Sequence, residues 1–263
     1  MPAPPIFRYA ERRPEAALLP WIRNFWMFEV GPSAPPVHHV PPDGCTSLVM
    51  HLNGAPSAEL MVSGPWLAPL AVPVAIGDRY GGARFQAGAA PLLLGVPSTS
   101  LRDRVRPAAP LLGARARAIE EALFGVRDID ALADRLTPAL MELVRGRAEP
   151  GPPVSSAAQR LLDSGGQYPL ATLASELGVS ERTMRRKFAA EVGVSPKQFA
   201  RIRRLFEAAW QVVGGNESWS RVAHGVGYAD QPHLNRDVTD LTGLTPGALR
   251  SRIRSTQHDE VVP

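Results

Sequence analysis

The pattern of apolar and polar positions repeats itself near the end of the chain. The stretch 173–196 is echoed by the stretch 222–246, at an offset of 49 residues in its first part and 50 in its second. Each stretch has a short apolar segment, a glycine, a small polar residue and a second segment with apolar residues at helical spacing. This order is typical of a helix-turn-helix, so the chain is predicted to hold two such units in tandem, and tandem units point to DNA binding.

The first unit (residues 173–196) has a clear start signal for its second helix. Gly178 can adopt a positive φ where one helix ends, and Ser180 can cap the next helix by accepting a backbone N–H hydrogen bond. The buried side of that helix is predicted from apolar residues at i, i+4 and i+8, which are Met184, Phe188 and Val192. The basic residues off this stripe are Arg182, Arg185 and Arg186.

Arginine suits both base and phosphate contacts, because its guanidinium group can donate two hydrogen bonds to guanine O6 and N7 or pair with a phosphate. On an isolated helix such arginines would more often only solubilise the surface. Their place on the second helix of a repeated helix-turn-helix favours DNA contact.

The second unit (residues 222–246) has the same layout with less positive charge. Asp230 is the predicted cap of a helix that runs to about Asp240, with Pro232 tolerated in its first turn. Leu234 and Val238 are predicted to face inward. The outward residues are Gln231, His233, Asn235 and Arg236. Gln and Asn can read adenine in the major groove, and Arg can read guanine. His233 fits a phosphate contact or a neutral surface position equally well.

A long helix is predicted between the two units. Ser195, Pro196 and Gln198 form a capping box, and Gly214 with Gly215 ends the helix. Its length of roughly 27 Å suits a spacer between two recognition helices in successive major grooves, about 34 Å apart. Two aromatic residues on its apolar stripe, Phe206 and Trp210, are expected to be core.

The first hundred residues predict a different kind of fold. Short alternating or β-branched runs lie at 26–30, 46–52, 59–64, 71–77 and 83–88, between Pro, Gly and Asp residues. They predict a small antiparallel β-sandwich or barrel with a cupin-like fold. The segment 111–145 then predicts a helical hairpin that breaks near Gly125, with Asp128 or Asp130 as a cap. Such a hairpin usually covers a sheet, and the alternative is a dimer seam.

Composition agrees with a chain of two domains, since 263 residues are enough for two cores. From 154 to 255 there are 14 Lys or Arg against 9 Asp or Glu, and from 1 to 153 there are 15 against 14, so the excess positive charge lies on the predicted DNA-binding part. Many proteins that never bind nucleic acid carry a similar excess. The chain lacks both a long apolar run and a signal-peptide pattern, which predicts a cytoplasmic protein without a membrane partner.

The segment from about Ser155 to Arg254 resembles the AraC-type DNA-binding domain of bacterial transcription regulators. The motifs are LASELGVSERTMRRKF and GVSPKQF in the first half, and VAHGVGYADQPHLNRDV with LTGLTPGALRSR in the second. The resemblance implies seven helices, with DNA readout by both recognition helices. The implied DNA-binding residues are Arg182, Thr183, Arg185, Arg186, Gln231, His233, Asn235 and Arg236. The family usually has phenylalanine where this chain has Val238, which implies a less tightly packed second unit.

The motifs HHVPPDGCTSLVMHLNG and ARFQAGAAPLLLGVPSTSLRDRV resemble an uncharacterised β-rich domain that often precedes AraC-type domains. This second resemblance implies a sensor and names no ligand. A metal-binding or enzymatic β-barrel with the helices as a tether is the alternative, because four candidate ligands fall close together: His38, His39, Cys45 and His51. Their spacing matches no established metal pattern. The chain also lacks a G-x-S-x-G motif, so neither an enzyme, a metal nor a cofactor is expected.

We therefore expect an α+β chain that acts as a sequence-specific transcription regulator. Its predicted parts are a β-rich effector domain at 1–148, a linker at 149–156, a double helix-turn-helix at 157–255 and a tail at 256–263. The expected partner is double-stranded promoter DNA. Further candidate partners are RNA polymerase, a small-molecule effector and a second copy of the chain. Because the linker has few apolar residues, the C-terminal part is expected to fold alone.

Overall fold

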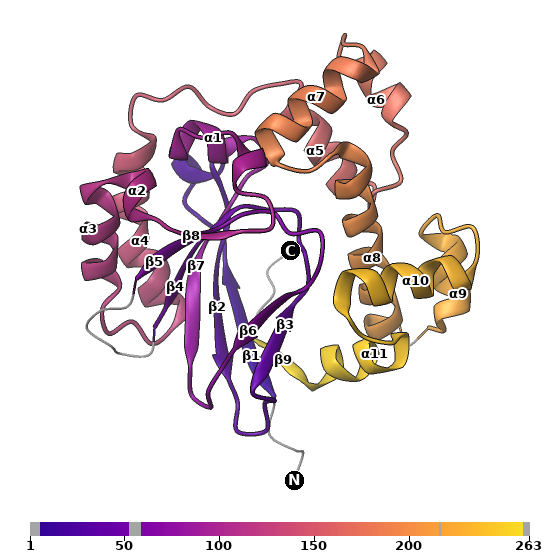
Figure 1. Cartoon of the computed structure of the whole chain (residues 1–263), viewed down its shortest axis with the longest axis horizontal. Helices are drawn as coiled ribbons and strands as arrows, with labels where there is room; N and C mark the ends of the chain where they lie inside the picture. The colour runs from indigo at the N-terminus through magenta and orange to yellow at the C-terminus, as the bar shows by residue number, and fades with distance from the viewer. Residues whose placement is uncertain (1–5, 53–58, 216, 260–263) are drawn as a thin grey trace.

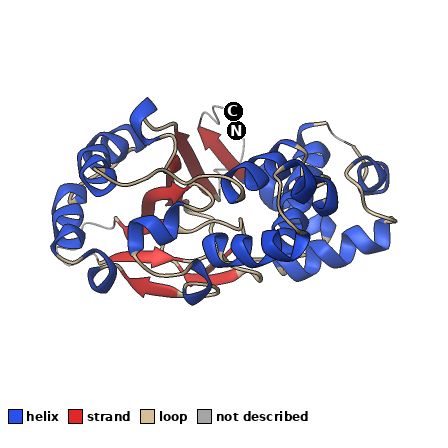
Figure 2. Cartoon of the chain, turned by 90° about the horizontal axis from the view of Figure 1, so that it is seen from above, coloured by secondary structure: helices blue, strands red, loops and turns tan. Residues whose placement is uncertain are grey.

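The computed structural model describes residues 6–52, 59–215 and 217–259. A β-sheet with covering helices forms one part of the molecule, and a purely helical part lies beside it (Figures 1 and 2). The chain is therefore of the predicted α+β class, with the strands near its N-terminus and the tandem helix-turn-helix near its C-terminus. Within these residues, every helix is too short or too polar to cross a membrane.

The main sheet has seven strands in the order β8-β5-β4-β7-β2-β1-β9, and its neighbours are antiparallel except for β1 and β9. A separate two-stranded sheet pairs β3 with β6. The bounds are β1 Phe7–Arg12, β2 Ile22–Val30, β3 Val37–Val40, β4 Ser47–His51, β5 Leu60–Ser63, β6 Leu70–Pro73, β7 Arg79–Phe85, β8 Val105–Pro107 and β9 Thr256–Asp259. The five predicted runs correspond to β2, β4, β5, β6 and β7, whereas β1, β3, β8 and β9 were not predicted.

The helices of the N-terminal part lie beside this sheet and at its upper end (Figure 1). They are α1 Ala89–Leu94, α2 Ala109–Leu112, α3 Ala114–Leu123 and α4 Ile129–Val144. The core between them includes Phe25, Leu48 and Phe85 from the strands, with Ile119 and Leu136 from the helices. The predicted hairpin corresponds to α3 and α4. Its second helix is capped by Asp128, whose side chain accepts a hydrogen bond from the backbone N–H of Ala131.

The C-terminal part contains seven described helices, the number that the family resemblance implied. They are α5 Val154–Asp163, α6 Leu170–Glu176, α7 Glu181–Val192, α8 Pro196–Gly214, α9 Trp219–Gly225, α10 Gln231–Thr242 and α11 Pro246–Ser255. Helix α5 begins inside the predicted linker. The predicted tail also differs, because Thr256 to Asp259 form β9 and pair with β1 in the N-terminal sheet.

The two parts contact one another directly, whereas the sequence suggested a connection through the linker alone. A Cβ atom at Gly44 would lie 2.9 Å from Cδ2 of Phe199, so the turn before β4 packs closely on α8. Arg252 in α11 also donates a hydrogen bond to His38 in β3. The prediction that Trp210 belongs to the core is wrong, because this side chain is 63% exposed on α8.

Candidate nucleic-acid interface

The second helix of the first unit, α7, begins and packs as its sequence predicts. Ser180 accepts a hydrogen bond from the backbone N–H of Thr183 at 3.2 Å, and Gly178 has a φ of 67°. Met184, Phe188 and Val192 are buried. The ring of Phe188 meets the ring of Phe199 edge to face with 5.5 Å between centroids, which attaches α7 to the start of α8.

The three candidate arginines of α7 are all exposed, and they lie off its buried side. Arg185 forms an i,i+4 ion pair with Glu181, which holds its guanidinium group along the helix surface. The hydroxyl of Thr183 accepts a hydrogen bond from Ser180 at 3.0 Å, so this candidate already takes part in the helix cap. Helix α7 thus presents Arg182, Arg185 and Arg186 to the surroundings.

The second recognition helix, α10, is capped by Asp230, whose carboxylate accepts a hydrogen bond from the backbone N–H of His233 at 2.7 Å. Leu234 and Val238 have no exposed surface and lie in the core of the second unit. Full burial of Val238 does not show how tightly its neighbours pack around it. The looser packing that the sequence predicts at this position therefore stays a prediction.

The four candidates of α10 differ in how they are placed. Arg236 is exposed, whereas Gln231, His233 and Asn235 are half-buried. The ring of His233 meets Tyr228 edge to face with 5.1 Å between centroids. Within the described part of the chain, the side-chain oxygen of Asn235 is buried without a hydrogen-bond partner. Because a buried oxygen is not reachable by a base edge, base reading by Asn235 would require its side chain to turn outward and stays a prediction.

Arg201 on α8 holds the second recognition helix, and the sequence did not single it out. Its Nε donates to Asp237 at 2.8 Å and its Nη2 to Asp240 at 2.7 Å, both on α10. Asp237 is 5% exposed. Burial lowers the pKa of Arg201, but the hydrogen bonds and charges of both aspartates outweigh it and raise the pKa above its usual value. These contacts attach α10 to α8, so that the two recognition helices share one support.

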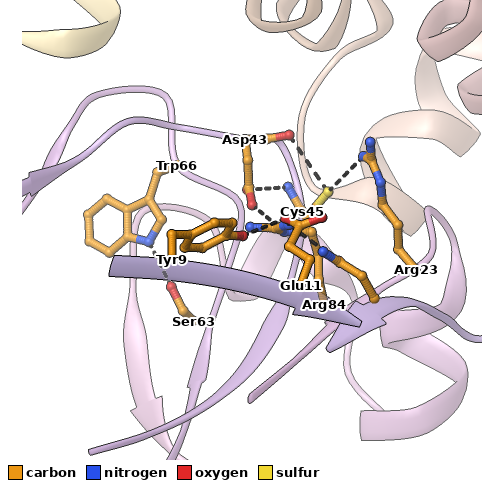
Figure 3. Close-up of polar contacts among 9 residues, drawn as sticks. Tyr9, Glu11, Arg23, Asp43, Cys45, Ser63, Trp66 and Arg84 are labelled. Atoms are coloured by element: carbon orange, nitrogen blue, oxygen red, sulfur yellow. Dashed lines mark hydrogen bonds and ion pairs between the residues drawn. The ribbon is translucent and has the colours of Figure 1, made fainter. Parts of the chain in front are cut away.

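A polar cluster lies in the N-terminal part beside α8 (Figure 3). Arg84 donates to Asp43 at 2.7 Å and to Glu11 at 3.2 Å, and Tyr9 donates to Glu11. The thiol of Cys45 lies 4.0 Å from a nitrogen of Arg23. Burial of the thiol, together with the charge of Asp43, raises the pKa of Cys45 and keeps it in the less reactive protonated form.

The four residues considered as metal ligands lie in different surroundings. The ring of His38 stacks on Phe28, and the ring of His51 stacks on Tyr80. Cys45 belongs to the polar cluster, and His39 lies on the exposed side of β3. Among the described residues, no group of three or more His, Cys, Asp or Glu side chains is placed so that it could hold a metal ion.

Comparison with known proteins assigns the helical part. Residues 173–252 match the family model of a helix-turn-helix domain, and residues 10–107 match a domain of unknown function (DUF6597). Two curated proteins described as putative AraC-like transcription regulators are similar to about a third of the chain. The protein of Streptomyces lividans is 32% identical over 88 residues, and that of Streptomyces antibioticus is 31% identical over 100 residues. Residues 173–252 form a helix-turn-helix domain, and the chain is similar in part to AraC-like regulators.

The similarity to these AraC-type regulators covers 34% and 37% of this chain, and only 29% and 33% of the relatives themselves. Solved structures are also similar. An AraC-type regulator of Chromobacterium violaceum has a TM-score of 0.36 at 20% identity and covers 38% of this chain and 89% of its own. ToxT of Vibrio cholerae O395 has a TM-score of 0.45 at 7% identity and covers 95% of this chain and 98% of its own.

Proposed function

We propose that the chain is a sequence-specific DNA-binding transcription regulator in which α7 and α10 read the two halves of one promoter site. The observation that carries this proposal is the shared support of the two recognition helices. Helix α7 packs on the start of α8 through Phe188 and Phe199, and Arg201 ties α10 to the same helix. Two capped helices on one spacer suit a duplex whose successive major grooves are about 34 Å apart.

Chemistry at the surface of these helices supports sequence reading. Exposed arginines on α7 fit guanine, and Gln231 and Asn235 on α10 fit adenine. His233 and Thr183 are proposed to assist by contacting the backbone or flanking bases. The proposed role is regulatory and not enzymatic, and its partner is double-stranded DNA.

The test begins with a DNA duplex selected by the full chain from a randomised library. Arg185→Ala and Arg186→Ala are each expected to weaken binding to that duplex by about 1 to 3 kcal/mol, because each would lose a bidentate base contact. The matched control is Arg117→Ala, since Arg117 is an exposed arginine on α3 with the same i,i+4 pairing to a glutamate, Glu121.

Gel-shift titrations on the selected duplex and on a scrambled duplex separate the outcomes. A loss confined to the selected duplex supports base reading. An equal loss on both would mean that the arginines contact phosphate only, and failure to enrich any duplex would contradict the proposed function.

We further propose that the N-terminal part senses a small molecule. A shallow, largely open pocket of about 290 Å³ lies where this part meets α5, and its lining includes Leu19, Gln86, Ser155 and Gln159. A ligand held there would contact both parts of the chain at once. Filling the pocket with Ser155→Trp is expected to abolish any ligand-induced rise in melting temperature found in a screen of metabolites, whereas Arg117→Ala should leave that rise intact.

A further inference from the structure

A short segment between β5 and β6 contacts both helix-turn-helix units. This bridging segment, residues 64–69, has the sequence GPWLAP. A Cβ atom at Gly193, the C-cap of α7, would lie 2.6 Å from Cγ of Pro65. A Cβ atom at Gly243, the C-cap of α10, would lie 3.6 Å from Cγ of Pro69. The bridging segment therefore contacts the ends of both recognition helices.

Leu67 lies between these two prolines and packs on two separate hydrophobic clusters. The cluster of the first unit includes Phe188 and Phe199, and that of the second unit includes Ile202 and Leu234. Among the described residues, Leu67 is the side chain that packs against both clusters. Because protein interiors are close-packed, a shift of the Leu67 side chain changes the packing of both clusters at the same time.

The bridging segment is held firmly to the N-terminal part. The backbone N–H of Leu67 donates to Asp103 at 2.8 Å, and the N–H of Asp103 donates to the carbonyl of Pro65 at 3.0 Å. A Cβ atom at Gly64 would lie 1.9 Å from the carbonyl oxygen of Leu101, so the two backbones meet at a distance that only glycine allows. The indole of Trp66 donates to Ser63 at 3.0 Å (Figure 3).

A second contact from the same region reinforces this attachment. The hydroxyl of Ser98, which is fully buried, donates to the backbone carbonyl of Glu191 in the last turn of α7 at 2.7 Å. Terminal carbonyls of a helix lack partners within the helix, so this hydrogen bond satisfies a group that α7 itself leaves open. The N-terminal part thus holds the end of α7 by both packing and hydrogen bonding.

We propose that the bridging segment sets the relative placement of α7 and α10, and that Leu67 is a positioning residue for the spacing between the two half-sites on DNA. This inference rests on the proposed DNA-binding function. A movement of the N-terminal part relative to α8 changes the fit of Leu67 against both clusters, and so changes which half-site spacing the protein prefers.

The test compares Leu67→Ala with the wild type on four duplexes. These are the duplex selected by the wild type, the same duplex with one base pair inserted or deleted between the half-sites, and the duplex with one half scrambled. Leu67→Ala is expected to bind the selected duplex about fivefold more weakly than the wild type does. The wild type is expected to bind the duplexes with altered spacing more weakly than the selected duplex, and this difference is the spacing penalty. Leu67→Ala is expected to lose most of the spacing penalty, because the coupling between the units is weakened. Binding to the half-scrambled duplex is expected to stay within twofold of wild type.

The matched control is Leu111→Ala, which also truncates a half-buried leucine but packs only in the N-terminal core. It is expected to keep the wild-type spacing preference. If Leu67→Ala fails to fold by circular dichroism, Pro69→Ala serves instead, since it removes the contact with Gly243 while keeping Leu67 and is expected to reduce the spacing penalty by a smaller factor.

An unchanged spacing preference in the folded variants would overturn the positioning role of the bridging segment while leaving DNA binding in place. A wild type that does not distinguish the selected duplex from random DNA would instead contradict the proposed function itself. The two failures are therefore distinguishable.

Discussion

Arg252 donates a hydrogen bond to Nδ1 of His38 at 2.7 Å, although 214 positions separate the two residues. The bond joins α11 of the second unit to β3 of the N-terminal part. The ring of His38 stacks on Phe28, and the guanidinium group of Arg252 lies 5.6 Å from the centre of the Phe7 ring. Burial, with smaller effects from Arg252 and His39, lowers the pKa of His38 to about 4.

The first prediction concerns stability at acid pH. The folded state keeps His38 neutral, so the contribution of this residue is complete above its usual pKa of 6.5 and is lost as the pH falls towards about 4. Between pH 7.5 and pH 5 the loss is expected to reach at most about 2 kcal/mol. Urea unfolding of the wild type and of His38→Gln measures it, because glutamine can still accept from Arg252 but does not titrate.

The matched control for this experiment is His39→Gln, a change at the neighbouring exposed position of β3. It is expected to retain the pH dependence of the wild type. A His38→Gln protein that loses stability as steeply as the wild type would show that other groups cause the acid sensitivity.

The second prediction concerns the support of α10. Arg201→Ala leaves the buried carboxylate of Asp237 without its ion-pair partner and is expected to lower the free energy of unfolding by about 1 to 3 kcal/mol. Asp240→Ala removes only the exposed half of the same contact and is expected to cost less than about 1 kcal/mol. Equal losses in the two variants, measured by urea unfolding, would argue against a special role for the buried pair.

The third prediction concerns the unequal shares of the two units in DNA affinity. Helix α7 presents three exposed arginines, whereas α10 presents one. Because phosphate and guanine contacts depend strongly on arginine, scrambling the half-site that faces α7 is expected to weaken binding more than scrambling the other half. Footprinting on the two half-scrambled duplexes measures this difference, and equal losses would remove the argument for unequal units.

The fourth prediction concerns Cys45. Burial raises its pKa, so the thiolate that reacts with oxidants is scarce at neutral pH. Cys45→Ser is expected to leave DNA binding and its response to peroxide unchanged, as measured by gel shift before and after treatment. Wild-type binding that changes with peroxide, paired with a Cys45→Ser protein that does not respond, would make the thiol a sensor.

Local patterns predicted the helical part well, because caps and helical stripes act within a few residues. Ser180, Ser195 and Asp230 cap the helices that the sequence indicated. Long-range contacts were beyond such patterns. Arg201 and Asp237 lie 36 positions apart, and the place of Leu67 between two clusters depends on how the two parts pack. Trp210 was misjudged because helical spacing identifies a face of α8 without showing whether anything covers it.

The pairing of β9 with β1 means that the helical part is fastened to the sheet at both of its ends. The linker before α5 leads out of the N-terminal part, and the strand after α11 leads back into it (Figure 1). Both ends of the segment that forms the seven helices are therefore attached to the N-terminal part, and the linker is not their single connection. A wide swing of these helices away from the sheet therefore first requires the backbone hydrogen bonds of β9 to break.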